Sequence, residues 1–200
     1  MKKTVLLLMM SFGMLISAQN YNLPATSPRQ TVTQQLSISN ISVDYGRPAV
    51  KGRTIFGELV PFGKVWRAGA NGTTKLTFGQ DFMFGGKLVK KGTYGLFIIP
   101  KANEWEIILN SDANGWGSSA YDEKKNVAST TVPVKNTMDV QEWFKIDFEN
   151  LSDDGMTMTF AWDKARVSVP LMVANSDSIS QIKDKLKEIK KINDDMNKKK

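Results

Sequence analysis

The chain of 200 residues contains neither cysteine nor histidine. Without cysteine, disulfides, thiolate nucleophiles, iron–sulfur clusters and zinc fingers are excluded. Without histidine, the Ser-His-Asp triad, the HExxH zinc site and histidine-ligated haem are excluded as well. Acid–base catalysis would need a carboxylate, lysine or tyrosine with a shifted pKa, because no remaining side chain has an ordinary pKa between about 5 and 8. We expect no cofactor and no metal site.

Only one long apolar run is present, and it lies at the N-terminus. Two lysines precede apolar residues 5–16, which end at Ser17-Ala18. A basic start, a short apolar stretch and a small residue before a polar one are typical of a secretory signal peptide. A retained membrane anchor is the alternative, but the run is shorter than the ~20 residues that span a bilayer. We therefore expect signal peptide 1–18, a mature chain beginning at Gln19, and export to the periplasm or the extracellular space without a lipid anchor or a transmembrane segment.

Positive charge is concentrated at the two ends of the chain. The formal net charge is +7, but residues 181–200 contribute eight lysines against four acidic residues, and the signal segment contributes two lysines. Nucleic-acid binding typically uses a basic surface interleaved with aromatic side chains. The basic tail has no aromatic residue and the body is nearly neutral. We therefore expect no nucleic-acid partner.

Apolar and polar residues alternate in many short segments of the body. A period of two is typical of half-buried strands. About ten strands at this close spacing predict an all-β antiparallel sandwich, jelly-roll or immunoglobulin-like, over residues 19–175. The clearest segments are 41–46, 75–78, 94–98, 104–109, 144–149, 156–162 and 166–173.

Three features set the expected strand boundaries. Gly85-Gly86 predicts a tight hairpin, because two glycines allow positive φ at both central positions. Asp163-Lys164 predicts a turn between the last two strands, and Pro170 predicts an edge strand because proline cannot donate to a ladder.

Residues 176–200 predict a lysine-rich helix. Ile179, Ile182, Leu186, Ile189 and Met196 form one narrow apolar stripe at helical spacing. Three arrangements are open for it: packing on the sandwich, self-association as a short coiled coil, or contact with an anionic membrane.

Arginine is rare and clustered. The chain has 22 lysines and five arginines, yet four of the arginines lie within residues 29–67. Residues 46–72 also hold six of the fifteen glycines. A planar guanidinium binds carboxylates, phosphates or several carbonyls where a lysine does not. The cluster is therefore either a ligand site for an anionic or sugar-like group, or a set of buried ties to backbone carbonyls. The candidate ligand-binding residues are Arg29, Arg47, Arg53, Trp66, Arg67, Asn71 and, in the polar loop 111–126, Trp116. Three further tryptophans on strands, Trp105, Trp143 and Trp162, are expected in the core.

Several long motifs occur in order along the chain. They are SPR at 27–29, YGRPAVKGRTIFG at 45–57, VPFGKVWRAGAN at 60–71, and KGTYGLFIIP at 91–100 followed by Trp105. Over about residues 25–173 the chain resembles the secreted bacterial domain-of-unknown-function family numbered twenty-nine eleven. The resemblance implies an exported, β-rich domain and brings no established activity or catalytic residues.

Three classes of function remain open. We favour a non-catalytic protein that binds an anionic or polyhydroxylated ligand, such as a small molecule or glycan, or that has an envelope-associated role. The first alternative is a carboxylate-dependent hydrolase of glycans, which needs two carboxylates flanking one bond. Asp44 and Glu58 lie nearest the arginine cluster, and Asp112, Asp122 and Glu123 lie in the other irregular loop. The second alternative is a structural or assembly role that uses the tail.

Overall fold

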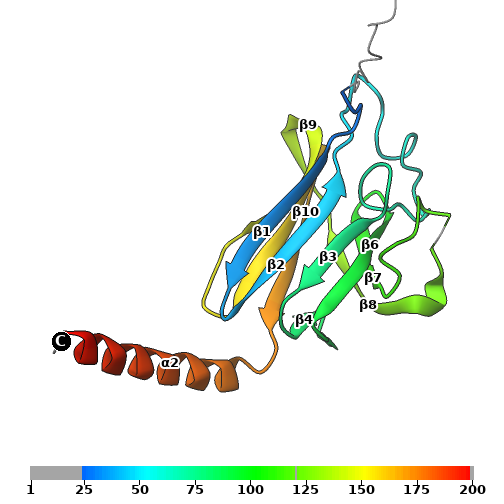
Figure 1. Cartoon of the computed structure of the whole chain (residues 1–200). Coiled ribbons are helices and arrows are strands. Elements are labelled where there is room, and N and C mark those ends of the chain that lie inside the picture. The colour runs from blue at the N-terminus through cyan, green and yellow to red at the C-terminus, as the bar shows by residue number, and fades with distance from the viewer. Residues whose placement is uncertain (1–23, 120, 199–200) are drawn as a thin grey trace, which may run out of the picture.

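The structure is a computed structural model that describes residues 24–119 and 121–198. The predicted signal peptide 1–18 and Gln19 lie outside the described residues, as does the side chain of Ile179. A β-sandwich and one long helix make up the described chain (Figure 1).

Two antiparallel sheets form the sandwich. The six-stranded sheet consists, in spatial order, of β1 (Arg29–Leu36), β2 (Ser39–Gly46), β3 (Thr74–Phe78), β6 (Gly92–Pro100), β7 (Glu104–Asn110) and β8 (Asn126–Pro133). The four-stranded sheet consists of β5 (Lys87–Val89), β4 (Phe82–Phe84), β10 (Gly155–Val173) and β9 (Lys135–Glu149), and a short 3-10 helix, η1 (Glu123–Lys125), precedes β8. The prediction of an all-β sandwich is confirmed.

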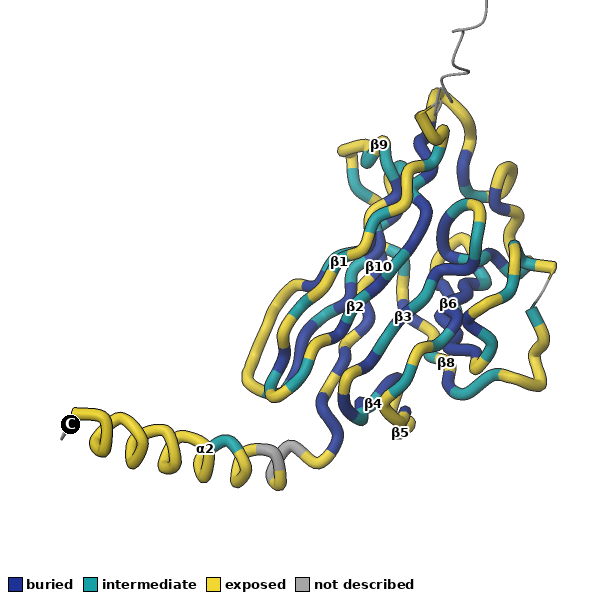
Figure 2. Tube along the Cα trace, in the orientation of Figure 1, coloured by how far each residue is buried: buried dark blue, intermediate teal, exposed yellow. Residues whose placement is uncertain are grey.

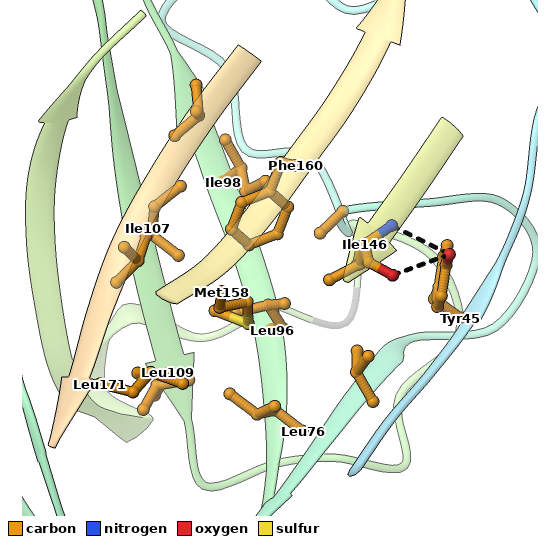
Figure 3. Close-up of a cluster of buried hydrophobic side chains, with 14 of the residues drawn as sticks. Tyr45, Leu76, Leu96, Ile98, Ile107, Leu109, Ile146, Met158, Phe160 and Leu171 are labelled. Atoms are coloured by element: carbon orange, nitrogen blue, oxygen red, sulfur yellow. Dashed lines mark hydrogen bonds between the residues drawn. The ribbon is translucent and has the colours of Figure 1, made fainter. Parts of the chain in front are cut away.

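The hydrophobic core lies between the two sheets. Leu76, Leu96 and Ile107 of the six-stranded sheet face Met158 and Phe160 of the four-stranded sheet, and all five are fully buried (Figure 3). Burial alternates along most strands, as the sequence period predicts (Figure 2).

Tyr45 of β2 connects the six-stranded sheet to β9, an edge strand of the four-stranded sheet. Its hydroxyl accepts a hydrogen bond from Ile146 N (2.9 Å) and donates one to Ile146 O (3.2 Å) (Figure 3). Ile146 belongs to β9, an edge strand, so this hydroxyl serves backbone groups that no further strand reaches. Desolvation by burial raises the pKa of Tyr45 above its ordinary value.

The predicted hairpin and the predicted late turn have different outcomes. Gly85 (φ 57°) and Gly86 (φ 78°) connect β4 and β5, which confirms the hairpin. The prediction of a turn at Asp163-Lys164 is wrong, because β10 runs through both residues, with register shifts against β9. Asp163 has φ 49°, and this bulge moves the buried face from even to odd positions.

The predicted edge position holds at Pro170 itself, although β10 as a whole is not an edge strand. β10 lies between β4 and β9. Proline is tolerated there because Pro170 falls after the last pairing with β9, at Arg166, and before the first pairing with β4, at Leu171.

The predicted helix is confirmed as α2 (Ser176–Asn197). It extends away from the sandwich instead of packing on it (Figure 1). Its described apolar side chains are exposed (Figure 2). Among the described residues, no helix is long and apolar enough to cross a membrane.

Candidate functional site

The glycine-rich connection between β2 and β3 first follows the open edge of β9. Val50 N donates to Glu142 O (2.8 Å), and Phe144 N donates to Pro48 O (2.9 Å). The guanidinium of Arg47 donates through Nε to Phe144 O (3.0 Å). Together with Tyr45, these contacts close the edge of β9, and we call residues 45–50 with residues 142–146 the β9 seam.

The connection then folds back on itself around Arg53. Its Nε donates to Val50 O (3.1 Å) and its Nη2 donates to Ala49 O (2.5 Å). One guanidinium thus holds two carbonyls of the turn that leaves the β9 seam, which is a bidentate use of the planar fork.

Trp66 anchors the second half of the connection. Its backbone exchanges two hydrogen bonds with Ile98 of β6 (2.7 and 2.8 Å), and its indole N–H donates to Gly69 O (3.0 Å). The ring stacks on Trp162 with a centroid distance of 5.6 Å and an angle of 20°, and meets Phe144 edge-on at 5.0 Å. Stacked and edge-to-face rings are the favoured aromatic geometries, so this cluster is a rigid base.

A cavity of about 300 Å³ lies against this aromatic base. Its walls combine apolar and cationic side chains, and none of its lining residues is Asp or Glu. We call it the Arg67 pocket. It is lined by Ser27, Pro48, Arg53, Leu59, Val60, Trp66, Arg67, Gly69, Ala70, Asn71 and Trp162.

Two residues that line this pocket each have a buried hydrogen-bond donor without an acceptor among the described residues. Arg67 Nε and Trp162 Nε1 are both buried, and neither donates to an acceptor among the described residues. Trp162 is 1% exposed. Buried indole and guanidinium N–H groups almost always have partners, because an unpaired one costs about 1–3 kcal/mol. Burial also lowers the pKa of Arg67, and no opposite charge offsets that desolvation.

The structure brings part of the predicted site together. Arg53, Trp66, Arg67 and Asn71 all line the Arg67 pocket. Arg47 lies in the β9 seam, bonded to a carbonyl.

Arg29 and Trp116 lie instead in a neighbouring open depression that shares Asn71 with the pocket. There Arg29 forms an ion pair with Asp44 (2.8 Å), and its Nη2 donates to the carbonyls of Asp44 (3.2 Å) and Thr73 (3.0 Å). Trp116 is 73% exposed.

The tryptophans on strands do not all behave as expected. Trp105 and Trp162 are in the core, but Trp143 is only half-buried, because its position alternates with the buried Phe144 and Ile146 and falls on the outer face of β9. Sequence reasoning missed the role of Trp162 in the pocket. Its alternation correctly predicts burial, but it gives no information on where the indole N–H points.

The carboxylates considered for hydrolysis do not converge on this pocket. Asp44 is held by Arg29, and Glu58 is exposed and does not line the pocket. Asp112 forms an ion pair with Lys125 (2.9 Å), and its hydrogen bond with that ammonium lowers its pKa. Asp122 accepts a hydrogen bond from the backbone N–H of Lys124 at the start of η1.

Comparison with known proteins gives a family. The family model described as a protein of unknown function (DUF2911) matches residues 27–171. The chain belongs to this family. The match includes the β9 seam and every residue of the Arg67 pocket, and it ends before α2. No curated protein and no solved structure matches the chain.

Proposed function

We propose that this DUF2911 protein is a non-catalytic binding protein that holds a small organic anion in the Arg67 pocket. The observation that supports this most directly is that Arg67 and Trp162 line one cavity whose lining contains no carboxylate, and that Arg67 Nε and Trp162 Nε1 are buried without an acceptor among the described residues. An anionic group bound in this cavity would supply the charge opposite to that of Arg67.

The shape and lining of the pocket narrow the ligand class. A volume of about 300 Å³ is at the lower end of small-molecule sites, which fits a compact ligand. The walls made by Leu59, Val60, Trp66 and Trp162 favour a ligand with an apolar or aromatic body. Arg67 and Arg53 favour a carboxylate at one end of that body.

Export is part of the proposal. The two lysines and apolar residues 5–16 support a secretory signal, so the ligand would be met outside the cytoplasm. Mass spectrometry of the protein from an exporting host should show a mature chain that begins at Gln19. An intact Met1 on the exported material would contradict this part.

A matched pair of probes tests the binding role. Benzoate and benzamide have nearly the same shape but differ in charge. At about ten times its dissociation constant, benzoate should stabilise the protein by about 1.4 kcal/mol, which raises Tm by roughly 4 °C. Benzamide at the same concentration should have little effect.

Two variants assign that effect to the pocket. Arg67→Gln should abolish the response to benzoate, whereas Lys64→Gln should keep it. Lys64 is exposed, lies on the same connection and does not line the pocket, so its substitution removes an equal charge. Equal responses of Arg67→Gln and Lys64→Gln, or equal responses to the two probes, would contradict the proposal.

A further inference from the structure

The described apolar stripe of α2 is exposed to solvent. Ile182, Leu186, Ile189 and Met196 are 46–56% exposed, and Ile192 beside them is 53% exposed. The helix leads away from the sandwich, and exposed residues cover nearly all of it (Figures 1 and 2). Lys183 of α2 contacts the sandwich, because its Nζ lies 3.8 Å from Oδ2 of Asp153. An exposed apolar stripe of this kind marks an interaction surface.

Charged side chains around α2 are sorted by face. A helix advances by about 100° per residue, so Lys185 and Lys190 lie on opposite flanks, each within about 75° of the middle of the stripe. The carboxylates lie more than about 110° away from it, on the far half of the helix. Those beyond the first turn are Asp184, Glu188, Asp194 and Asp195. The side that carries the stripe is therefore cationic, although the positive and negative charges of the helix as a whole are nearly equal in number.

This arrangement disfavours a second copy of the chain as the partner. In a parallel pair of helices, Lys185 of one copy would face Lys190 of the other, and an antiparallel pair would also place lysines against lysines. No carboxylate flanks the stripe to pair with them. Asn193 also interrupts the stripe between Ile189 and Met196, which lowers the stability of such a pair.

The same arrangement fits a flat anionic surface. From these observations we infer that α2 binds an anionic membrane surface and lies in its plane. The stripe enters the boundary between headgroups and acyl chains, and Lys185 and Lys190 extend along its flanks to the phosphates. The far face, with the ion pair between Lys187 and Asp184 (3.1 Å), stays in water. The inference is independent of the Arg67 pocket.

A local probe in the full-length chain tests this directly. Because the chain contains no cysteine, a single Ile192→Cys labelled with an environment-sensitive fluorophore reports on α2 alone, whatever the N-terminal segment does. Vesicles of phosphatidylcholine mixed with phosphatidylglycerol should shift its emission to the blue, and vesicles of phosphatidylcholine alone should not. The same label at Asp184→Cys, which lies nearly opposite the middle of the stripe, should shift much less.

Three double variants separate the contributions in the labelled protein. Leu186→Gln with Ile189→Gln should weaken binding by about 100-fold or more, because two apolar side chains lose their burial. Lys185→Gln with Lys190→Gln should weaken it by about 30-fold, since each lysine near an anionic surface contributes about fivefold. Lys187→Gln with Lys191→Gln removes the same charge from the far face and should cost less than about fivefold.

Several outcomes would overturn the inference. They are no blue shift with anionic vesicles, an equal shift with neutral vesicles, or equal weakening by the two lysine double variants. Sedimentation of the protein without vesicles provides one more. A dimer that dissociates in Leu186→Gln with Ile189→Gln, in a protein that does not bind anionic vesicles, would assign the stripe to a second copy.

Discussion

Arg47 and Arg67 belong to the same glycine-rich connection, but they end in different surroundings. Arg47 donates to Phe144 O in the β9 seam, where an edge strand offers carbonyls that no other strand reaches. Arg67 lies against an aromatic base, and its Nε has no acceptor among the described residues. We therefore expect Arg47 to stabilise the fold, and we propose that Arg67 keeps its charge for a ligand.

The β9 seam should give the largest effect. Tyr45→Phe removes the hydroxyl that serves both the N–H and the C=O of Ile146. We expect the free energy of unfolding to fall by about 3 kcal/mol, because the N–H and C=O of Ile146 at the edge of β9 both lose the hydroxyl to which they are bonded. Urea unfolding measures this. Tyr94→Phe is the matched control, since the Tyr94 hydroxyl donates to Lys90 O in an exposed position and its loss should cost less than about 1 kcal/mol. Equal losses would show that the β9 seam is not a special tie.

Arg47→Met should give a smaller loss of the same sign. Methionine keeps much of the apolar stem but leaves Phe144 O without its guanidinium donor. We expect the free energy of unfolding to fall by about 1–2 kcal/mol in urea. An unchanged free energy of unfolding would mean that Arg47 does not stabilise the fold, and the proposed difference between Arg47 and Arg67 would be lost.

The sequence predicts the frame of the molecule better than it predicts this distinction. Alternation in residues 94–98 and 104–109 depends on local burial, so β6 and β7 follow from it, as the Gly85-Gly86 hairpin follows from φ. Asp163 misleads because a bulge and a turn both accept a polar residue at positive φ. The clustered arginines identify the segment that forms the β9 seam and lines the Arg67 pocket, and its role in binding stays a prediction.

The partners of those arginines are beyond sequence reasoning. Arg47 binds a carbonyl nearly one hundred positions away, at Phe144, and backbone carbonyls carry no residue-type signal. The unpaired N–H of Trp162 depends on how Trp66 stacks on it, which only the folded packing decides. The fold can therefore be predicted largely from the sequence. Which arginines bind backbone carbonyls and which line the pocket cannot be predicted in this way.

Raising the pH should lower the free energy of unfolding through Tyr45 by a smaller amount than the two substitutions in the β9 seam do. Burial raises the pKa of Tyr45 in the folded protein above its ordinary value of 10.0. Above about pH 10 the unfolded chain releases this proton while the folded chain retains it, so stability falls as pH rises toward the folded pKa. Wild-type protein should lose more unfolding free energy between pH 9 and pH 11 than Tyr45→Phe does. Tyr94, whose pKa is also raised, is present in both proteins, so the difference belongs to Tyr45. Parallel curves would contradict the assignment.

Arg67→Met should give the smallest change in stability. It should raise the free energy of unfolding, whereas Tyr45→Phe and Arg47→Met should lower it. The substitution of Arg67 removes a partly buried guanidinium whose burial lowers its pKa and whose Nε has no acceptor among the described residues. Replacing such a charge by an apolar side chain of similar length should raise the free energy of unfolding by about 1 kcal/mol, a gain typical of positions that serve binding at a cost in stability. Arg47→Met makes the same replacement in the same connection. Any difference between the two urea curves therefore comes from the surroundings of the two arginines and not from the residue type. A loss of 1 kcal/mol or more in Arg67→Met would mean that this arginine is a tie like Arg47, and the anion pocket would then lose its main support.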